Sequence, residues 1–272
     1  MPTEAILSLA DDLVSFWRRF RHCFWTQTRD QSPKAYHYLS GLLRMTKKRT
    51  FAGIGRTTEQ SGENIQHFMT NSPWEAQPVY RQVQAEIAAT PELQTGGMLL
   101  LDESADAKSG TKTAGAGRQR NGRLGKIDVC QVGVFLSFVK DNTWTWVDGE
   151  LFLPEHWFTP DMADERHRLG IPAQRTFKTK VELGWEMIQR AQSQGLPFEA
   201  VGCDDLYGRA HWFRAKLADA NLVYMADVPC NMQVYMTRPE FGVPETQPGH
   251  QGPPYTVPRV LSDDEPKTVS QV

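Results

Sequence analysis

Two short stretches decide the fold: GMLLLDES at 97–104 and FEAVGCDD at 198–205. Each contains an apolar run of strand length that leads into an aspartate, Asp102 in the first and Asp204 in the second. Short apolar runs bounded by glycine or polar residues are typical of buried strands. Because ligands and metals gather where the strands of an α/β sheet end, neighbouring strands here would bring Asp102 and Asp204 into one cleft.

Further strands and helices surround these two runs. Alternating stretches at 128–139 and 144–153 predict two more strands, and 222–228 predicts a last one. Apolar residues at helical spacing predict helices at 160–169, 178–194 and 210–220. This order allows an antiparallel meander followed by helical crossovers. We therefore expect an α/β (mixed) fold, with a ribonuclease-H-like sheet of about five strands spanning 97–230.

The first 92 residues predict a small all-α region. Apolar positions at helical spacing occur in 6–20, 36–45, 64–69 and 79–87. Breaks are expected at Ser32-Pro33, at Ser72-Pro73 and at the pair Gly53 and Gly55. A basic edge follows the second helix and consists of Arg44, Lys47, Lys48 and Arg49. It is equally well explained as a solvated helix end or as a contact surface for nucleic acid.

The tail 231–272 is rich in proline, with six prolines from Pro239 to Pro258 and an acidic run at 263–265. Proline at this density sustains neither a helix nor a central strand, so we expect an extended, weakly ordered segment.

Composition indicates an ordinary globular chain. The 272 residues carry a formal net charge of -2, so nucleic-acid binding would depend on local basic patches. No apolar run approaches the roughly 20 residues needed to cross a bilayer, and we expect a cytoplasmic protein with no membrane partner. The four scattered cysteines, with no CxxC pair, are expected to be reduced and mostly buried.

Asp102 and Asp204 are the candidate catalytic and metal-binding residues. Paired carboxylates repel each other unless a cation lies between them, and Mg²⁺ prefers such hard oxygen ligands. That arrangement would support in-line displacement at a phosphodiester. The alternative is that each aspartate only caps the element that follows it, and spacing alone favours this alternative.

A basic segment without acidic residues lies between the strands, at 108–126. Such a segment could hold a DNA backbone, although a solvated hairpin explains it equally well. Its glycines do not follow a nucleotide-binding spacing. Its cations are Lys108, Lys112, Arg118, Arg120, Arg123 and Lys126.

Several motifs together resemble the transposases of insertion sequences that belong to the DDE superfamily endonucleases. They keep the family's order and approximate spacing from about residue 10 to 235. They are Ser72–Trp74, Leu101–Ser104, Lys108–Gly110, Gly125–Val134, Glu150–Pro154, Gly170–Pro172 and Asp204–Gly208. The resemblance implies that Asp102 and Asp204 are the first two metal-binding aspartates, using Mg²⁺ or Mn²⁺. It also implies a helical DNA-binding region at 1–92 before the catalytic core.

The third acidic residue of that family is missing from its expected place. The family pattern is Tyr, two residues, Arg, three residues, Glu; Tyr235 and Arg238 have the first spacing, but Gly242 stands where the Glu belongs. Glu240 is displaced into the proline-rich segment. We therefore expect a C-terminally truncated transposase, from a decayed or frameshifted element or as one half of a divided protein. An incomplete sheet would expose apolar surface and favour instability or self-association.

Three functions follow as hypotheses. The first is metal-dependent cleavage and strand transfer at the terminal repeats of a mobile element, on double-stranded DNA and in association with the nucleoid. The second is a catalytically dead DNA-binding fragment that competes with or regulates full-length transposase. The third is a hydrolase of small phosphoesters assisted by His156, His167 or His211, although isolated histidines are more often solvated. Trp144, Trp146, Trp157 and Trp212 could stack on bases, but packing explains them more often.

Overall fold

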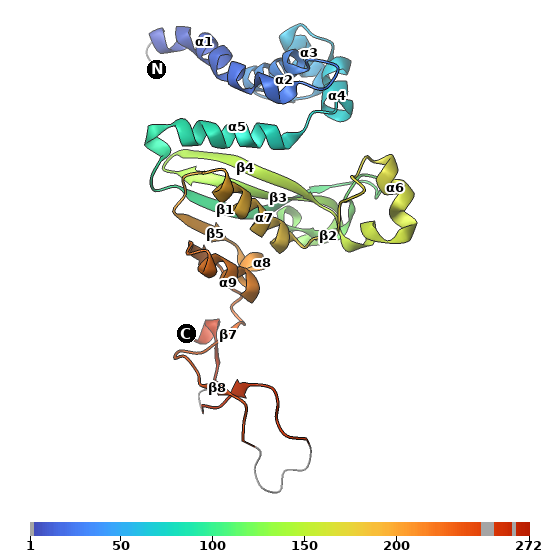
Figure 1. Cartoon of the computed structure of the whole chain (residues 1–272). Helices are drawn as coiled ribbons and strands as arrows, with labels where there is room; N and C mark the ends of the chain where they lie inside the picture. Colours follow the sequence, from blue (N-terminus) through green and yellow to red (C-terminus); the bar gives the residue numbers. More distant parts are fainter. Residues whose placement is uncertain (1–2, 246–252, 263–264) are drawn as a thin grey trace. The chain divides into compact units, whose positions relative to one another are not determined.

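The computed structural model describes residues 3–245, 253–262 and 265–272 (Figure 1). Residues 246–252 of the proline-rich stretch and 263–264 of the acidic run lie outside the described residues. The chain divides into two compact units. One contains Met1–Gly97, Phe135–Glu150 and Glu186–Phe198, and the other contains Met98–Val134, Leu151–Trp185 and Glu199–Val272.

Residues 3–93 are mostly helical, as expected for the all-α region over 1–92. Their aromatic core is built by Phe24, Phe68 and Trp74, whose ring centroids lie 5.3 Å (Phe24 to Trp74) and 5.6 Å (Phe68 to Trp74) apart. The helices are α1 (Thr3–Phe20), η1 (Arg21–Phe24), α2 (Ser32–Arg44), α3 (Phe51–Thr58), α4 (Gly62–Asn71), α5 (Ala76–Ala89) and η2 (Pro91–Leu93).

Helix α3 was not predicted, and the break expected at Gly53 and Gly55 is wrong because both glycines lie inside α3. The Thr50 hydroxyl starts the helix by accepting a hydrogen bond from the Gly53 amide at 3.1 Å. Glycine is present for a packing reason: a Cβ on Gly55 would lie 2.7 Å from the Gly62 amide nitrogen. Close approach of two helix backbones therefore outweighs the weak helix propensity of glycine.

A mixed six-stranded sheet follows, which confirms the expected fold class. The strands run in the order β2, β3, β1, β5 and β6, while β4 pairs with β3 off this path. Strand β5 is parallel to both β1 and β6, and β2 is antiparallel to β3. The strands are β1 (Met98–Ala107), β2 (Gly117–Asn121), β3 (Lys126–Lys140), β4 (Thr143–Phe152), β5 (Ala200–Cys203) and β6 (Val223–Ala226).

Buried side chains alternate along β3 and recur at helical spacing along α7, as expected for elements that face a core. Val132, Val134 and Leu136 are fully buried on β3, and Leu183 and Met187 are fully buried on α7. The helices of this part are η4 (Glu155–Phe158), η5 (Pro160–Met162), α6 (Ala163–Arg168), α7 (Lys180–Ser193), α8 (Asp205–Gly208) and α9 (His211–Asp219).

The tail forms two small antiparallel pairs. β7 (Gln233–Val234) pairs with β10 (Lys267–Thr268), and β8 (Phe241–Gly242) pairs with β9 (Arg259–Val260), before η6 (Val269–Gln271). Among the described residues, no helix has the length and apolar character that a bilayer crossing requires. Cys23 and Cys130 are buried, whereas Cys203 is half-buried and Cys230 is exposed, and all four are free thiols.

Candidate active site

Three adjacent parallel strands bring three aspartates to one edge of the sheet. Leu101 of β1 pairs with Cys203 of β5, and Cys203 pairs with Ala226 of β6. The next residue in each strand direction is an aspartate, namely Asp102, Asp204 and Asp227. All three line one hollow, together with the apolar residues of the same strands. The structure therefore brings the two predicted aspartates together and adds a third carboxylate.

Asp102 does not end its strand, contrary to the sequence-based expectation. Strand β1 continues to Ala107 because its other neighbour in the sheet is the long strand β3. Only the parallel pairing with β5 stops, at Leu101 and Cys203. Asp102 is exposed, and its Oδ1 accepts a hydrogen bond from the Glu103 amide at 2.7 Å.

Asp204 caps a short helix, as the alternative interpretation of this residue predicted. Its Oδ1 accepts a hydrogen bond from the Leu206 amide, at 3.0 Å, at the start of α8. Burial raises the pKa of the Asp204 carboxyl, and the nearby carboxylates Glu103, Asp102 and Asp205 raise it further. The hydrogen bond from Leu206 lowers the pKa without cancelling these effects. The edge is therefore a region of concentrated negative charge that a cation would relieve.

Glu103, on the opposite face of β1 from Asp102, forms an ion pair beneath the site. Glu103 Oε1 accepts from Lys180 Nζ of α7 at 2.8 Å, and the two side chains are only 22% and 16% exposed. Glu103 Oε2 and the Tyr207 hydroxyl are both buried and have no hydrogen-bond partner among the described residues. Burial, followed by the charges of Glu103 and Asp204, raises the Tyr207 pKa. Lys180 thus anchors Glu103 while leaving one carboxylate oxygen available.

Sequence reasoning missed Asp227, Lys180 and Tyr207. A signal existed for Asp227, because it directly follows the strand Val223–Ala226, just as Asp204 directly follows Ala200–Cys203. No local pattern marks Lys180 or Tyr207, because helix packing brings them to the strand. A Cβ on Gly184 of α7 would lie 2.5 Å from Leu101 and 3.2 Å from Tyr207, which shows how closely α7 approaches β1.

The site offers hard oxygen donors without a complete metal cage. Among the described residues, no group of three or more His, Cys, Asp or Glu side chains is arranged to hold a metal ion. Asp102 and Asp204 can supply carboxylate oxygens, the donors that Mg²⁺ and Mn²⁺ prefer. The arrangement can support a divalent ion, but it needs further donors from substrate oxygens or water.

The second half of the predicted basic segment, from Gly117, lies in a β-hairpin of the same unit. Strand β2 pairs antiparallel with β3, with Arg118 opposite Val129 and Arg120 opposite Ile127. Lys108 pairs with Asp106 at 2.7 Å and Lys126 with Asp128 at 3.0 Å. Lys112, Arg118, Arg120 and Arg123 are exposed. Arg118, Arg120 and Arg123 form no ion pair within the part of the chain described, although the charges of Arg118 and Arg123 contribute to lowering the pKa of Asp128 and Asp106. The hairpin therefore carries an excess of exposed positive charge.

The sheet face that carries the aspartates is apolar and open. Leu100 is 39% exposed, and Val223 and Met225 on β6 are 68% and 67% exposed. Leu100, Met225 and the aspartates line the same hollow. The exposed apolar surface expected from the sequence is therefore present beside the carboxylates.

Of the candidate histidines and tryptophans, His156, Trp146 and Trp157 make packing contacts, whereas His167, His211, Trp144 and Trp212 are exposed. His156 lies against Gly117 of β2, where an added Cβ would be 2.8 Å from its ring. Trp157 is fully buried and donates from Nε1 to the Ala116 carbonyl at 3.1 Å. Trp146 stacks on Phe135 with ring centroids 4.7 Å apart. These contacts favour the packing interpretation over base stacking for Trp146 and Trp157.

Comparison with known proteins identifies the family. Residues 19–272 match the family described as DDE superfamily endonuclease. The chain is also similar to a protein of Microchaete diplosiphon described as a probable transposase for insertion sequence element IS701, with 29% identity over 212 residues. That match covers 75% of this chain and 51% of the relative, so the chain spans about half the length of this curated relative. Because the family match covers nearly the whole sequence, the chain belongs to the DDE superfamily endonucleases.

Proposed function

We propose that the chain is a DNA transposase of an insertion sequence, acting in cleavage and strand transfer at the element's ends. The observation that carries this proposal is the placement of Asp102 and Asp204 after paired residues of two adjacent parallel strands. An endonuclease family match and a relative described as a transposase support the same reaction class. Asp102 and Asp204 are its proposed catalytic residues.

The proposed cofactor is Mg²⁺ or Mn²⁺, and the donor chemistry of the site fits it. Asp102 and Asp204 would hold the ion; burial, and after it the neighbouring carboxylates, raise the pKa of Asp204, and the ion would neutralise the negative charge of these carboxylates. When bound, the ion would activate the attacking water or 3′-hydroxyl and stabilise the leaving oxygen. The carboxylates would orient the ion at the edge of the sheet.

The proposed partner is double-stranded DNA that carries the terminal repeats of the element. Residues 1–92 would form the DNA-binding region, 97–230 the catalytic core and 231–272 the start of an inserted segment. Arg118, Arg120 and Arg123 on the hairpin and Lys112 in the loop before β2 are the exposed candidates for phosphate contacts. Lys126, next to the hairpin turn, and Lys108 would contribute as well. Self-association and a location on the bacterial nucleoid in the cytoplasm belong to the same proposal.

A second candidate function is a DNA-binding fragment that competes with an active transposase. The observation that favours it is the lack of a three-ligand group among the described residues. Two carboxylates hold a pair of divalent ions weakly, so binding without cleavage is a coherent outcome.

Nicking of supercoiled and terminal-repeat DNA in Mg²⁺ or Mn²⁺ tests the proposal. The chain is compared with Asp102→Ala and with the control Asp106→Ala, an exposed carboxylate on the same face of β1. Metal-dependent nicking that disappears in Asp102→Ala and persists in Asp106→Ala supports the transposase. DNA binding without nicking in any form supports the competitor, and nicking that survives Asp102→Ala overturns the assigned site.

A further inference from the structure

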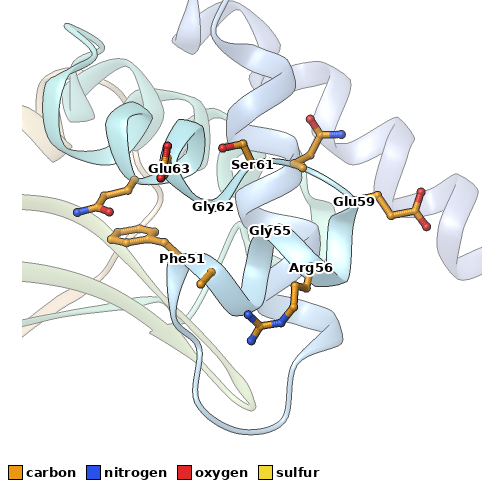
Figure 2. Close-up of a pocket in the computed structure, with 10 residues that line it drawn as sticks. Phe51, Gly55, Arg56, Glu59, Ser61, Gly62 and Glu63 are labelled. Carbon is orange, nitrogen blue, oxygen red and sulfur yellow. The ribbon is translucent and has the colours of Figure 1, made fainter.

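Helices α3 and α4 form a tightly joined pair in the N-terminal helical region. A Cβ on Gly55 would lie 2.7 Å from both the Gln60 carbonyl oxygen and the Gly62 amide nitrogen. A Cβ on Gly62 would lie 2.8 Å from the Ala52 Cα. Figure 2 shows Gly55 of α3 facing Gly62 at the start of α4. The two backbones meet so closely that glycine is required on both sides.

The connection between the helices is a defined three-residue turn. Thr58 ends α3, and Glu59 adopts a left-handed conformation with φ 55°. Ser61 then caps α4, and its Oγ accepts from the Asn64 amide at 3.3 Å. Two short helices joined by such a turn form a helix-turn-helix unit, in which the second helix is presented to a partner.

The inward face of this unit is fixed by core packing. Ile54 of α3 and Ile65 and Phe68 of α4 are each only 1% exposed. The opposite face of α4 is consequently directed outward. Its exposed residues are Glu63, Asn64, Gln66, His67, Thr70 and Asn71. Thr70 bonds to the Gln66 carbonyl and to Asn71, whereas the side chains of Gln66 and His67 make no hydrogen bond within the described residues.

Exposed cations precede and flank α4. Lys47, Lys48 and Arg49 lie in the segment that leads into α3, and Arg56 lies on the outer side of α3. They form no ion pair within the residues that the structure describes. Glu59 and Glu63 are the only acidic residues in the stretch 44–71, against five cations including Arg44. A chain with a net charge of -2 therefore concentrates positive charge at this unit.

We propose that α4 is a recognition helix that enters the major groove of duplex DNA and reads bases with Gln66 and His67. This rests on the proposed function to the extent that the chain's partner is DNA. The major groove admits an α-helix, and a Gln amide can donate to and accept from one adenine edge. Lys47, Lys48 and Arg49, which are adjacent in one segment, contact phosphates beside the groove, which fixes the register of α4 without reading sequence.

The test is binding of the full chain to DNA in EDTA, so that cleavage plays no part. A duplex is first selected from a random-sequence pool, and fluorescence anisotropy then compares it with a scrambled duplex. We expect Gln66→Ala and His67→Ala each to weaken binding to the selected duplex by roughly 5- to 100-fold, with little change on the scrambled one. Lys47→Ala should weaken binding to both and reduce the salt dependence.

One further variant is a negative control, and a second one separates loss of base reading from loss of folding. Gln192→Ala removes an exposed polar side chain of α7 and should leave both affinities unchanged. Gln66→Glu retains a helix-forming side chain of the same size, so it should lose the selected duplex while preserving the far-ultraviolet circular dichroism of the chain. Its carboxylate cannot donate to a base and is repelled by phosphate.

Several outcomes overturn the inference. Unchanged affinity of Gln66→Ala, Gln66→Glu and His67→Ala for the selected duplex would remove α4 from base reading. Equal losses of affinity for the selected and scrambled duplexes would mean that α4 contacts only the DNA backbone. Failure to select any preferred duplex would also refute the inference that α4 reads bases. Base reading that persists in a chain without metal-dependent nicking would instead refute only the proposed enzymatic function.

Discussion

Leu101 and Cys203 are partners in the parallel register of β1 and β5, so Asp102 and Asp204, which follow them, emerge beside each other. Backbone pairing alone decides this placement, and one residue of slip would turn one of the aspartates to the other face of the sheet. The electrostatic consequence is measurable, because burial, and after it the charges of Glu103 and Asp102, raise the Asp204 pKa.

Asp204→Asn should stabilise the chain at neutral pH. A raised folded-state pKa means that the folded chain binds the proton more tightly than the unfolded chain, so stability falls as pH rises from the ordinary value of 3.8 through the folded pKa. Asparagine removes the charge and can still cap Leu206. We expect a higher Tm for Asp204→Asn at pH 7 by differential scanning calorimetry, with the difference shrinking toward acidic pH.

Asp106→Asn is a control variant for which we expect a change in Tm opposite to that of Asp204→Asn. Its hydrogen bond and charge interaction with Lys108 hold the Asp106 pKa below its usual value. That stability is present at neutral pH and is lost as pH falls through the folded pKa. Asp106→Asn should therefore lower the neutral-pH Tm slightly; a shift of the same sign in both variants would contradict the assigned electrostatics.

Asp227→Asn should make Cys203 more reactive. Burial raises the Cys203 pKa to about 11, with further contributions from Asp204 and Asp227. Removing the Asp227 charge lowers this pKa and increases the thiolate fraction, up to about tenfold for each pKa unit. The rate of iodoacetamide labelling, followed by mass spectrometry of the Cys203 peptide, checks this. Labelling of exposed Cys230 is the internal reference, and an unchanged Cys203 rate would place Asp227 away from the thiol.

Arg190→Met should destabilise the first unit. Asp148 is 1% exposed, and its Oδ2 accepts from Arg190 Nε at 2.8 Å while its Oδ1 accepts from Gln77 Nε2 at 2.8 Å. Removing Arg190 leaves a buried carboxylate short of its cation, at a cost of about 3–5 kcal/mol. Urea unfolding measures the loss. Arg168→Met, which removes an exposed pair with Glu165, should have a much smaller effect because solvent screens that pair, and equal effects would argue against a buried network.

Gly55→Ala should weaken the helix-turn-helix unit. The added methyl group would meet backbone atoms of Gln60 and Gly62 at 2.7 Å, and overpacking of this kind costs about 1–3 kcal/mol. Gly110→Ala is the matched control because nothing lies within 4 Å of its added Cβ. Thermal unfolding should separate the two variants clearly. A harmless Gly55→Ala substitution would show that α3 and α4 pack less closely than described.

Hydrophobic periodicity predicted most elements, including the helix that became α7 and the strand that became β3, because burial imposes a repeat that a single sequence displays. It failed at α3 and β2. In α3, Gly53 and Gly55 satisfy interhelical packing while resembling a break. In β2, the arginines Arg118 and Arg120 are exposed, and β3 supplies the pairing that makes the segment a strand. In both elements, contact with a neighbouring helix or strand outweighs the local propensity of the residues.

The sequence by itself predicted the mixed sheet and the helical N-terminal region, because apolar periodicity is a local pattern. It also marked Asp102 and Asp204 as candidates, although spacing alone favoured a capping role for them. Only the tertiary structure decided that Asp227 joins Asp102 and Asp204, that Lys180 pairs with Glu103, and that α4 faces outward. These relationships depend on strand register and on the contact of helix backbones. Both bring together residues that are distant in the sequence, and no local sequence pattern marks such contacts.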